Sequence, residues 1–129
     1  MSFNWKNFQD VGDYLKRNPN EAYQRSAVGR YYYSCYVPVK EYFETVIRAI
    51  SHDENSHQAI IEGLCKSNNE KENDLGDYLS KLRRYRNNAD YHNIFKRNNV
   101  NKAQKTSKDI YDLLDELIIE KKKYGFFKF

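Results

Sequence analysis

The chain has 129 residues, enough for one domain with a buried core and too few for a second. Its formal net charge is +4, and 40% of its residues are hydrophobic and 16% aromatic, with twelve tyrosines whose amphipathic rings suit half-buried seams. The longest stretch without a formal charge, residues 31–39, is too short to span a bilayer, which argues against a membrane protein.

The first predicted helix runs from residue 4 to about 17, with Phe3 and Phe8 at the two positions of a hydrophobic staple. Residues 18–21 then indicate a second helix start, with Asn18 as N-cap and Pro19 in the first helical position.

The second predicted helix is long and continues to about residue 50. Three consecutive tyrosines, 31–33, cover most of its circumference, which places it in the middle of a bundle. We expect Pro38 to kink it by removing the hydrogen bond to the Ser34 carbonyl.

The rest of the chain predicts three more helices. A short one spans about 57–66, a mobile loop follows at 67–73, and a helix then begins near residue 73 or 74 and runs to the region of His92. After a connector at 98–101, the last helix runs from about 101 to 124. The aromatic and basic end, 121–129, is expected to dock on a partner or on the protein's own core. With no alternating strand pattern, residues 1–129 predict a single all-α bundle of about five helices.

Targeting and redox features point to the cytoplasm. The first residues, 1–5, lack the basic segment followed by an apolar run that begins a signal peptide, so we expect no secretory signal. Cys35 and Cys65 are isolated and lack metal-ligand spacing, as expected in a reducing compartment. We expect both to be buried small hydrophobes.

The fourth predicted helix carries an arginine and a histidine six positions apart, Arg86 and His92. At 100° per residue the two side chains diverge by about 120° and are separated by about 9 Å along the axis. A shared site therefore needs a loosened helix end or a second copy of the chain.

This region also holds the positive charge. Residues 81–108 contain nine Lys or Arg and one acid, Asp90, while the remainder of the chain has a net charge of −4. Localised charge of this kind suits a polyanion such as RNA, and it also suits a solvated helix-loop-helix turn.

Residues 86–92, Arg-Asn-Asn-Ala-Asp-Tyr-His, resemble the Arg-(Asn/Asp/His)-x-x-x-x-His signature of HEPN domains. These are small helical proteins of toxin-antitoxin pairs, abortive-infection systems and CRISPR-associated ribonucleases. Residues 25–34 are similar to the small-residue, Arg, Tyr-Tyr pattern on the family's second helix, so the resemblance covers nearly the whole chain. It departs at Ile94, where the subclass that ends the motif with His-x-Tyr has a tyrosine.

The resemblance implies a HEPN-like bundle and a metal-independent endoribonuclease, a toxin or defence effector, whose homodimer forms a composite cleft. Histidine exchanges protons near neutral pH and arginine is permanently charged, so we assign His92 to proton transfer and Arg86 to the phosphate, with Asn87 as an orienting group. The expected RNA-binding residues are Lys81, Arg83, Arg84 and Lys96. No cofactor and no metal is expected.

Several alternatives stay open. Arg86 and Asp90 have the spacing of a surface ion pair, and His92 has the position of a C-terminal capping residue. Arg30 and Tyr33 could support the site by facing the same cleft. Alternatively, Arg30 is buried scaffold that ties the second helix to the motif helix. The alternative function is a catalytically silent HEPN-like module that binds a nucleotidyltransferase antitoxin or a larger defence complex.

Overall fold

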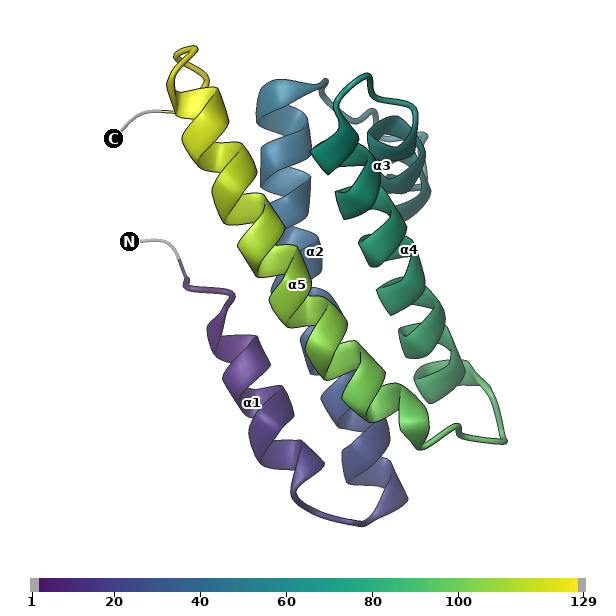
Figure 1. The fold of residues 1–129 in the computed structure, drawn as a ribbon. Helices are drawn as coiled ribbons and strands as arrows, with labels where there is room; N and C mark the ends of the chain where they lie inside the picture. Colours follow the sequence, from purple (N-terminus) through teal and green to yellow (C-terminus); the bar gives the residue numbers. More distant parts are fainter. Residues whose placement is uncertain (1–2, 128–129) are drawn as a thin grey trace.

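The computed structural model describes residues 3–127, and this part of the chain forms a bundle of five α-helices without strands (Figure 1). This confirms the predicted all-α bundle of about five helices. None of the five helices is both long enough and apolar enough to cross a membrane. The helices are α1 (Asn7–Lys16), α2 (Glu21–Val46), α3 (Ser56–Cys65), α4 (Glu70–Tyr91) and α5 (Asn98–Lys122).

The central element is α2, which packs against each of the other four helices. Tyr31 and Tyr32 are completely buried, as the run of tyrosines predicts. The helix continues through Pro38, which has no N–H to give to the Ser34 carbonyl. The hydroxyl of Tyr111 on α5 donates to that carbonyl instead, at 2.6 Å. The carbonyl that Pro38 leaves without a partner in α2 therefore forms a hydrogen bond between α2 and α5.

The ends of α1 and α2 differ from the predicted ones. Asn20, not Asn18, is the N-cap of α2, and its side chain accepts from the backbone N–H of Ala22 at 2.9 Å. Pro19 therefore precedes the helix. At its other end α2 stops at Val46, four residues earlier than expected. The α1 helix begins three residues late, although the expected contact between Phe3 and Phe8 is present, with ring centroids 5.4 Å apart.

The prediction of a mobile loop at 67–73 is wrong. Asn69 caps α4 by accepting from the Glu72 backbone N–H, so most of this segment is helical. Glu72 is 4% exposed and accepts a hydrogen bond from the Tyr42 hydroxyl. Asn73 donates to three backbone carbonyls at the end of α3 and just beyond it. Polar side chains that indicated a loop instead form the hydrogen bonds that hold α4 against α3.

Cys35 is fully buried as expected, but Cys65 is exposed, which corrects that expectation. It is the last residue of α3, and its thiol points to the Asp77 carboxylate at 3.6 Å. At the carboxyl end of the described chain, Phe127 stacks on Tyr42 with ring centroids 6.1 Å apart, so this residue docks on the protein's own core. Residues 128 and 129 lie outside the described part.

The turn between α1 and α2 and the connector between α4 and α5 lie at the same end of the bundle (Figure 1). The Arg97 guanidinium links them by donating to the Pro19 carbonyl at 3.1 Å. The connector comprises residues 92–97, because α5 already begins at Asn98 and not near residue 101. This end of the molecule carries the Arg/His motif.

Candidate functional site

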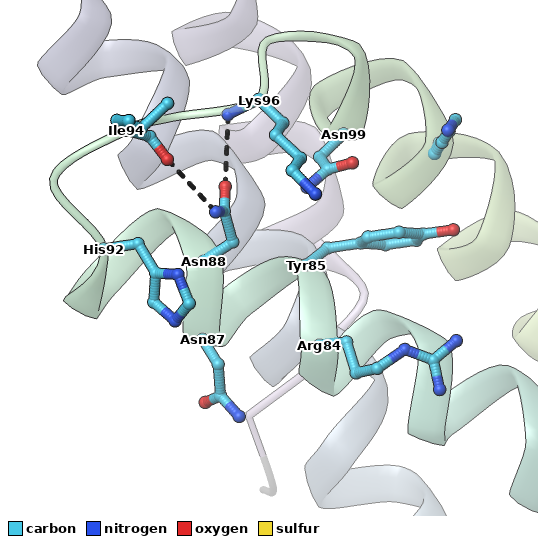
Figure 2. A pocket seen from close by; sticks show the side chains of 9 residues that line it. Arg84, Tyr85, Asn87, Asn88, His92, Ile94, Lys96 and Asn99 are labelled. Carbon is cyan, nitrogen blue, oxygen red and sulfur yellow. Dashed lines mark hydrogen bonds between the residues drawn. The ribbon is translucent and has the colours of Figure 1, made fainter.

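His92 stands where α4 ends. It is the C-cap of the helix, with extended backbone angles (φ −102°, ψ 138°), and its N–H donates to the Asn88 carbonyl at 3.3 Å. The Asn88 side chain folds over the connector, donating to the Ile94 carbonyl and accepting from the Lys96 N–H, both at 3.2 Å (Figure 2). An asparagine that bonds the next loop in this way competes with further helix and ends it.

Arg25, near the start of α2, fixes the same helix end from the other side. Its guanidinium donates to the backbone carbonyls of Ala89 at 2.9 Å, His92 at 2.6 Å and Asn93 at 2.9 Å. It also lies over the Phe95 ring, 5.1 Å from the centroid. Ala89 lies in the last turn of α4, and His92 and Asn93 directly follow the helix, so this one side chain satisfies three carbonyls where the helical hydrogen bonding ends. The backbone of His92 is therefore held in place.

A pocket of about 690 Å³ opens between the end of α4, the connector and the start of α5 (Figure 2). Four of the predicted site residues line it: Arg84, Asn87, His92 and Lys96. The remaining lining residues are Tyr85, Asn88, Ile94, Asn99 and Lys102. The structure thus brings the proposed proton-transfer group and its orienting asparagine into one basic pocket.

Arg86 is not among the residues that line this pocket. Its guanidinium donates to the Asp90 carboxylate at 2.8 Å and to the Tyr91 hydroxyl at 3.3 Å. It also lies over the rings of Tyr32 and Tyr33 on α2, 5.8 and 5.3 Å from their centroids. The arginine faces α2 while the histidine faces the pocket, as the helical spacing of the motif indicates. Within one chain the two groups do not share a cleft.

The tyrosines beneath Arg86 belong to a cluster with a second histidine, His57 of α3. The imidazole of His57 stacks on Tyr36 with centroids 4.0 Å apart and planes 12° apart, and its Nδ1 is hydrogen-bonded to the Tyr32 hydroxyl. Burial, followed by the charges of Arg83 and Arg86, lowers the pKa of His57 to about 4. Burial also raises the pKa of Tyr32, so at neutral pH the tyrosine donates and a neutral imidazole accepts.

The other predicted residues do not line the pocket. Arg83 is near the His57 cluster, and Lys81 lies over the Tyr78 ring at 5.9 Å. The ring of Tyr33 lies under the Arg86 guanidinium. Arg30 does not have the expected scaffold role, because its guanidinium lies over Phe8 of α1, 4.9 Å from the ring centroid. The link between α2 and the motif helix is made by Arg25.

Sequence reasoning missed Arg25, His57, Asn99 and Lys102. Arg25 lies within the segment that resembles the second HEPN helix, which is the one signal that marked it. His57 carried none. In residues 3–127, no group of three or more His, Cys, Asp or Glu side chains is placed to hold a metal ion.

The chain matches no protein-family model, no curated protein and no solved structure.

Proposed function

We propose that this protein is a metal-independent endoribonuclease of the HEPN type, a toxin or defence effector that acts as a homodimer. The observation that carries the proposal is the pocket that His92 and Asn87 line together with the cations Arg84 and Lys96. A proton acceptor next to phosphate-binding cations is the arrangement that intramolecular cleavage of RNA requires.

In this reaction His92 removes the proton of a ribose 2′-hydroxyl. The 2′-oxygen forms a bond to the adjacent phosphorus, and the bond from phosphorus to the 5′-oxygen of the next nucleotide breaks. That oxygen leaves with a proton, returned by the imidazolium, as a 5′-hydroxyl, and the other product is a 2′,3′-cyclic phosphate. Arg86 stabilises the charge on the phosphate oxygens, and Asn87 orients the phosphate or His92.

The orientation of Arg86 supports a dimer. Because Arg86 and His92 face different directions in one chain, a cleft that contains both takes them from different copies. Two of the large apolar side chains exposed at the end of α4 flank His92: Tyr91 is 71% exposed and Ile94 is 81% exposed. A second copy packed across residues 80–95 buries these side chains and places its own arginine by the pocket.

One observation favours the second candidate, a catalytically silent module that binds a nucleotidyltransferase antitoxin or a larger defence complex. Arg86 is already engaged by Asp90 and three aromatic rings, and its side chain is 17% exposed. In that case the basic end of the bundle recognises an acidic protein surface.

The discriminating experiment is RNA cleavage in excess EDTA by the wild type, His92→Ala and Arg86→Ala. Each substitution should reduce the cleavage rate by about 10² to 10⁴ while the circular dichroism spectrum stays helical. Lys66→Ala, an exposed position at the end of α3, is the control and should cleave like the wild type. Cleavage that persists in both motif variants, or products with 5′-phosphates, would contradict the proposal.

A further inference from the structure

Tyr32 of α2 is in contact with both the proposed phosphate-binding arginine and the histidine of α3. The Arg86 guanidinium lies over its ring, 5.8 Å from the centroid. The imidazole of His57 is nearly parallel to the same ring, with centroids 5.6 Å apart and planes 16° apart, and its Nδ1 is hydrogen-bonded to the Tyr32 hydroxyl. Because Tyr32 has no exposed surface, one buried ring connects the histidine to the arginine.

The hydrogen bond between Tyr32 and His57 has a defined direction. The imidazole is neutral at pH 7, so the tyrosine hydroxyl donates and Nδ1 accepts. A phenol that donates a hydrogen bond gains electron density on its oxygen and ring, because bonded groups polarise one another. The face of an aromatic ring attracts a cation through its negative charge density. An acceptor at position 57 therefore strengthens the attraction of the Tyr32 ring for Arg86.

Arg86 has two kinds of partner within its own chain. The Asp90 carboxylate, at 2.8 Å, cancels part of its charge. The rings of Tyr32, Tyr33 and Tyr91 carry no net charge, so they orient the guanidinium and leave its charge available for a phosphate. Tyr91 is 71% exposed and Tyr33 is half-buried, whereas Tyr32 is completely buried. Of the three rings, Tyr32 is thus the one whose position the core fixes.

The start of α3 holds His57 against Tyr32. The other face of this contact is Tyr36, whose ring stacks on the imidazole with centroids 4.0 Å apart. Ser56, the residue before His57, is hydrogen-bonded to the Tyr36 hydroxyl at 2.5 Å. Asn55 caps the helix by accepting from the Gln58 backbone N–H at 3.1 Å. These contacts restrict the rotation of the imidazole and keep Nδ1 directed at the Tyr32 hydroxyl.

We propose that His57 is a positioning residue for Arg86 and acts on it through Tyr32. By accepting the hydrogen bond from the Tyr32 hydroxyl, His57 orients and polarises the ring that holds the guanidinium ready for a phosphate. This gives α3, which contributes no residue to the pocket beside His92, a part in the site. The inference rests on the proposed function for the role of Arg86 in catalysis, but the effect of His57 on the Arg86 side chain is measurable without RNA.

Four variants separate this role from simple packing. Tyr32→Phe and His57→Phe each remove one side of the hydrogen bond and keep an aromatic ring in place. His57→Gln keeps an uncharged acceptor. Tyr36→Phe is the matched control, because it removes a hydroxyl from the same cluster, and in residues 3–127 the rings under Arg86 do not include Tyr36.

The first measurement is the exchange rate of the Arg86 Nε–H with water, followed by NMR. This group donates to Asp90, and its signal is assigned by its absence in Arg86→Lys. We expect exchange about threefold or more faster than in the wild type in Tyr32→Phe and in His57→Phe, because the ring holds the guanidinium less firmly. Tyr36→Phe should exchange like the wild type, and His57→Gln should lie between the wild type and His57→Phe.

The second measurement is RNA cleavage. Tyr32→Phe and His57→Phe should each lower kcat about three- to tenfold and change KM little, because Arg86 stabilises charge that develops in the transition state. In the Arg86→Ala chain neither substitution should lower the rate further, since the residue on which they act is absent. A purely structural role of His57 would lower the rate by the same factor in both backgrounds.

Three outcomes overturn the inference. They are Arg86 exchange in Tyr32→Phe and His57→Phe that equals that of Tyr36→Phe, a His57→Gln no closer to the wild type than His57→Phe, and cleavage losses of the same size with and without Arg86. If His57→Phe fails to fold, Tyr32→Phe decides alone, because it leaves the imidazole in place. A protein that never cleaves RNA contradicts the ribonuclease proposal, and the exchange rates then still decide whether His57 positions Arg86.

Discussion

The guanidinium of Arg25 donates a 2.6 Å hydrogen bond to the backbone carbonyl of His92, so a side chain at the start of α2 holds the last residue of the motif. The two residues are 67 positions apart in the chain. Through this bond the folding of α2 against α4 sets the position of the proposed proton-transfer group.

We predict that Arg25→Leu lowers the free energy of unfolding by about 1–3 kcal/mol, because three backbone carbonyls at the end of α4 lose their donor. Urea unfolding measures the change, and hydrogen exchange should show faster exchange in the connector at 92–97. Arg30→Leu is the control, because Arg30 belongs to the same helix and its guanidinium lies only over the Phe8 ring in the described structure. This substitution should change the free energy of unfolding by about 0.5–1 kcal/mol. Equal losses of unfolding free energy in the two variants would contradict the role of Arg25 in holding the end of α4.

Two glycines test the packing of α2 and α4. A Cβ at Gly29 meets no atom within 4 Å, whereas one at Gly76 lies 2.8 Å from the Cys65 Sγ and 3.1 Å from the Cys65 backbone nitrogen. We expect Gly29→Ala to stabilise the protein by about 0.5–1 kcal/mol through helix propensity. Gly76→Ala should destabilise it by about 1–3 kcal/mol, because α3 must move away. Thermal unfolding distinguishes these opposite signs, and a stabilised Gly76→Ala would show that α3 and α4 are not in close contact.

The sequence predicts the helices well and their ends poorly, for a physical reason. Apolar periodicity decides which segments become helices, and it is visible in one chain. The choice between Asn18 and Asn20 as a cap depends on the backbone angles of residues that both have good capping chemistry. In the segment 67–73, polar residues that suit a loop instead cap α4 and form hydrogen bonds to α3. These bonds depend on where α3 lies, which the local sequence does not show.

The candidate site also has a part that the sequence predicts and a part that only the fold shows. The divergence of Arg86 and His92 follows from helix geometry, so the sequence alone indicates it. The roles of Arg25 and His57 depend on elements far along the chain, and of the two only Arg25 lies in a segment that the sequence marks. Lys102 belongs to the basic segment 81–108 that the sequence marks, but only the fold shows that it lines the pocket.

His57 makes stability depend on pH in a defined window. Its folded-state pKa is about 4, below the ordinary value of 6.5, so the unfolded chain takes up the proton first as the pH falls. The contribution of His57 to stability is therefore fully present above about pH 6.5 and is lost progressively as the pH falls toward 4. Urea unfolding at several pH values should show a shallower decline over this window in His57→Gln than in the wild type.

The control for His57 is His52→Gln, an exposed histidine between α2 and α3, which should keep the wild-type slope. An NMR titration gives an independent reading, because the imidazole of His57 should stay neutral at pH 6. An imidazole that is half protonated near pH 6.5 would contradict the half-buried stack with Tyr36 and the hydrogen bond from Tyr32.

Asp90 restrains the proposed phosphate-binding arginine. We expect Asp90→Asn to raise RNA affinity severalfold, because the Arg86 guanidinium then has no carboxylate partner among residues 3–127 of its own chain. If one more phosphate is contacted, the slope of the logarithm of affinity against that of salt concentration should steepen by about 0.7. Fluorescence anisotropy with labelled RNA provides both values.

Asp109→Asn is the matched control for that experiment. Its carboxylate pairs with Lys105 at the same helical spacing and at the same distance of 2.8 Å, and its loss changes the net charge equally. If both variants gain affinity to the same extent, the effect is one of net charge and Arg86 has no particular role.

The last prediction concerns assembly. Arg86 faces the tyrosines of α2 and His92 faces the pocket, so a catalytic centre that needs both takes them from two chains. Mixing His92→Ala chains with Arg86→Ala chains then produces heterodimers in which one of the two clefts has an intact arginine and an intact histidine. We expect random mixing to restore up to about a quarter of the wild-type activity, since half of the dimers are mixed and each has one competent cleft. Each variant alone, at the same total concentration, is the control. If mixing restores nothing while light scattering shows that the chains exchange and dimerise, each chain holds a complete centre or none, and the composite site is wrong.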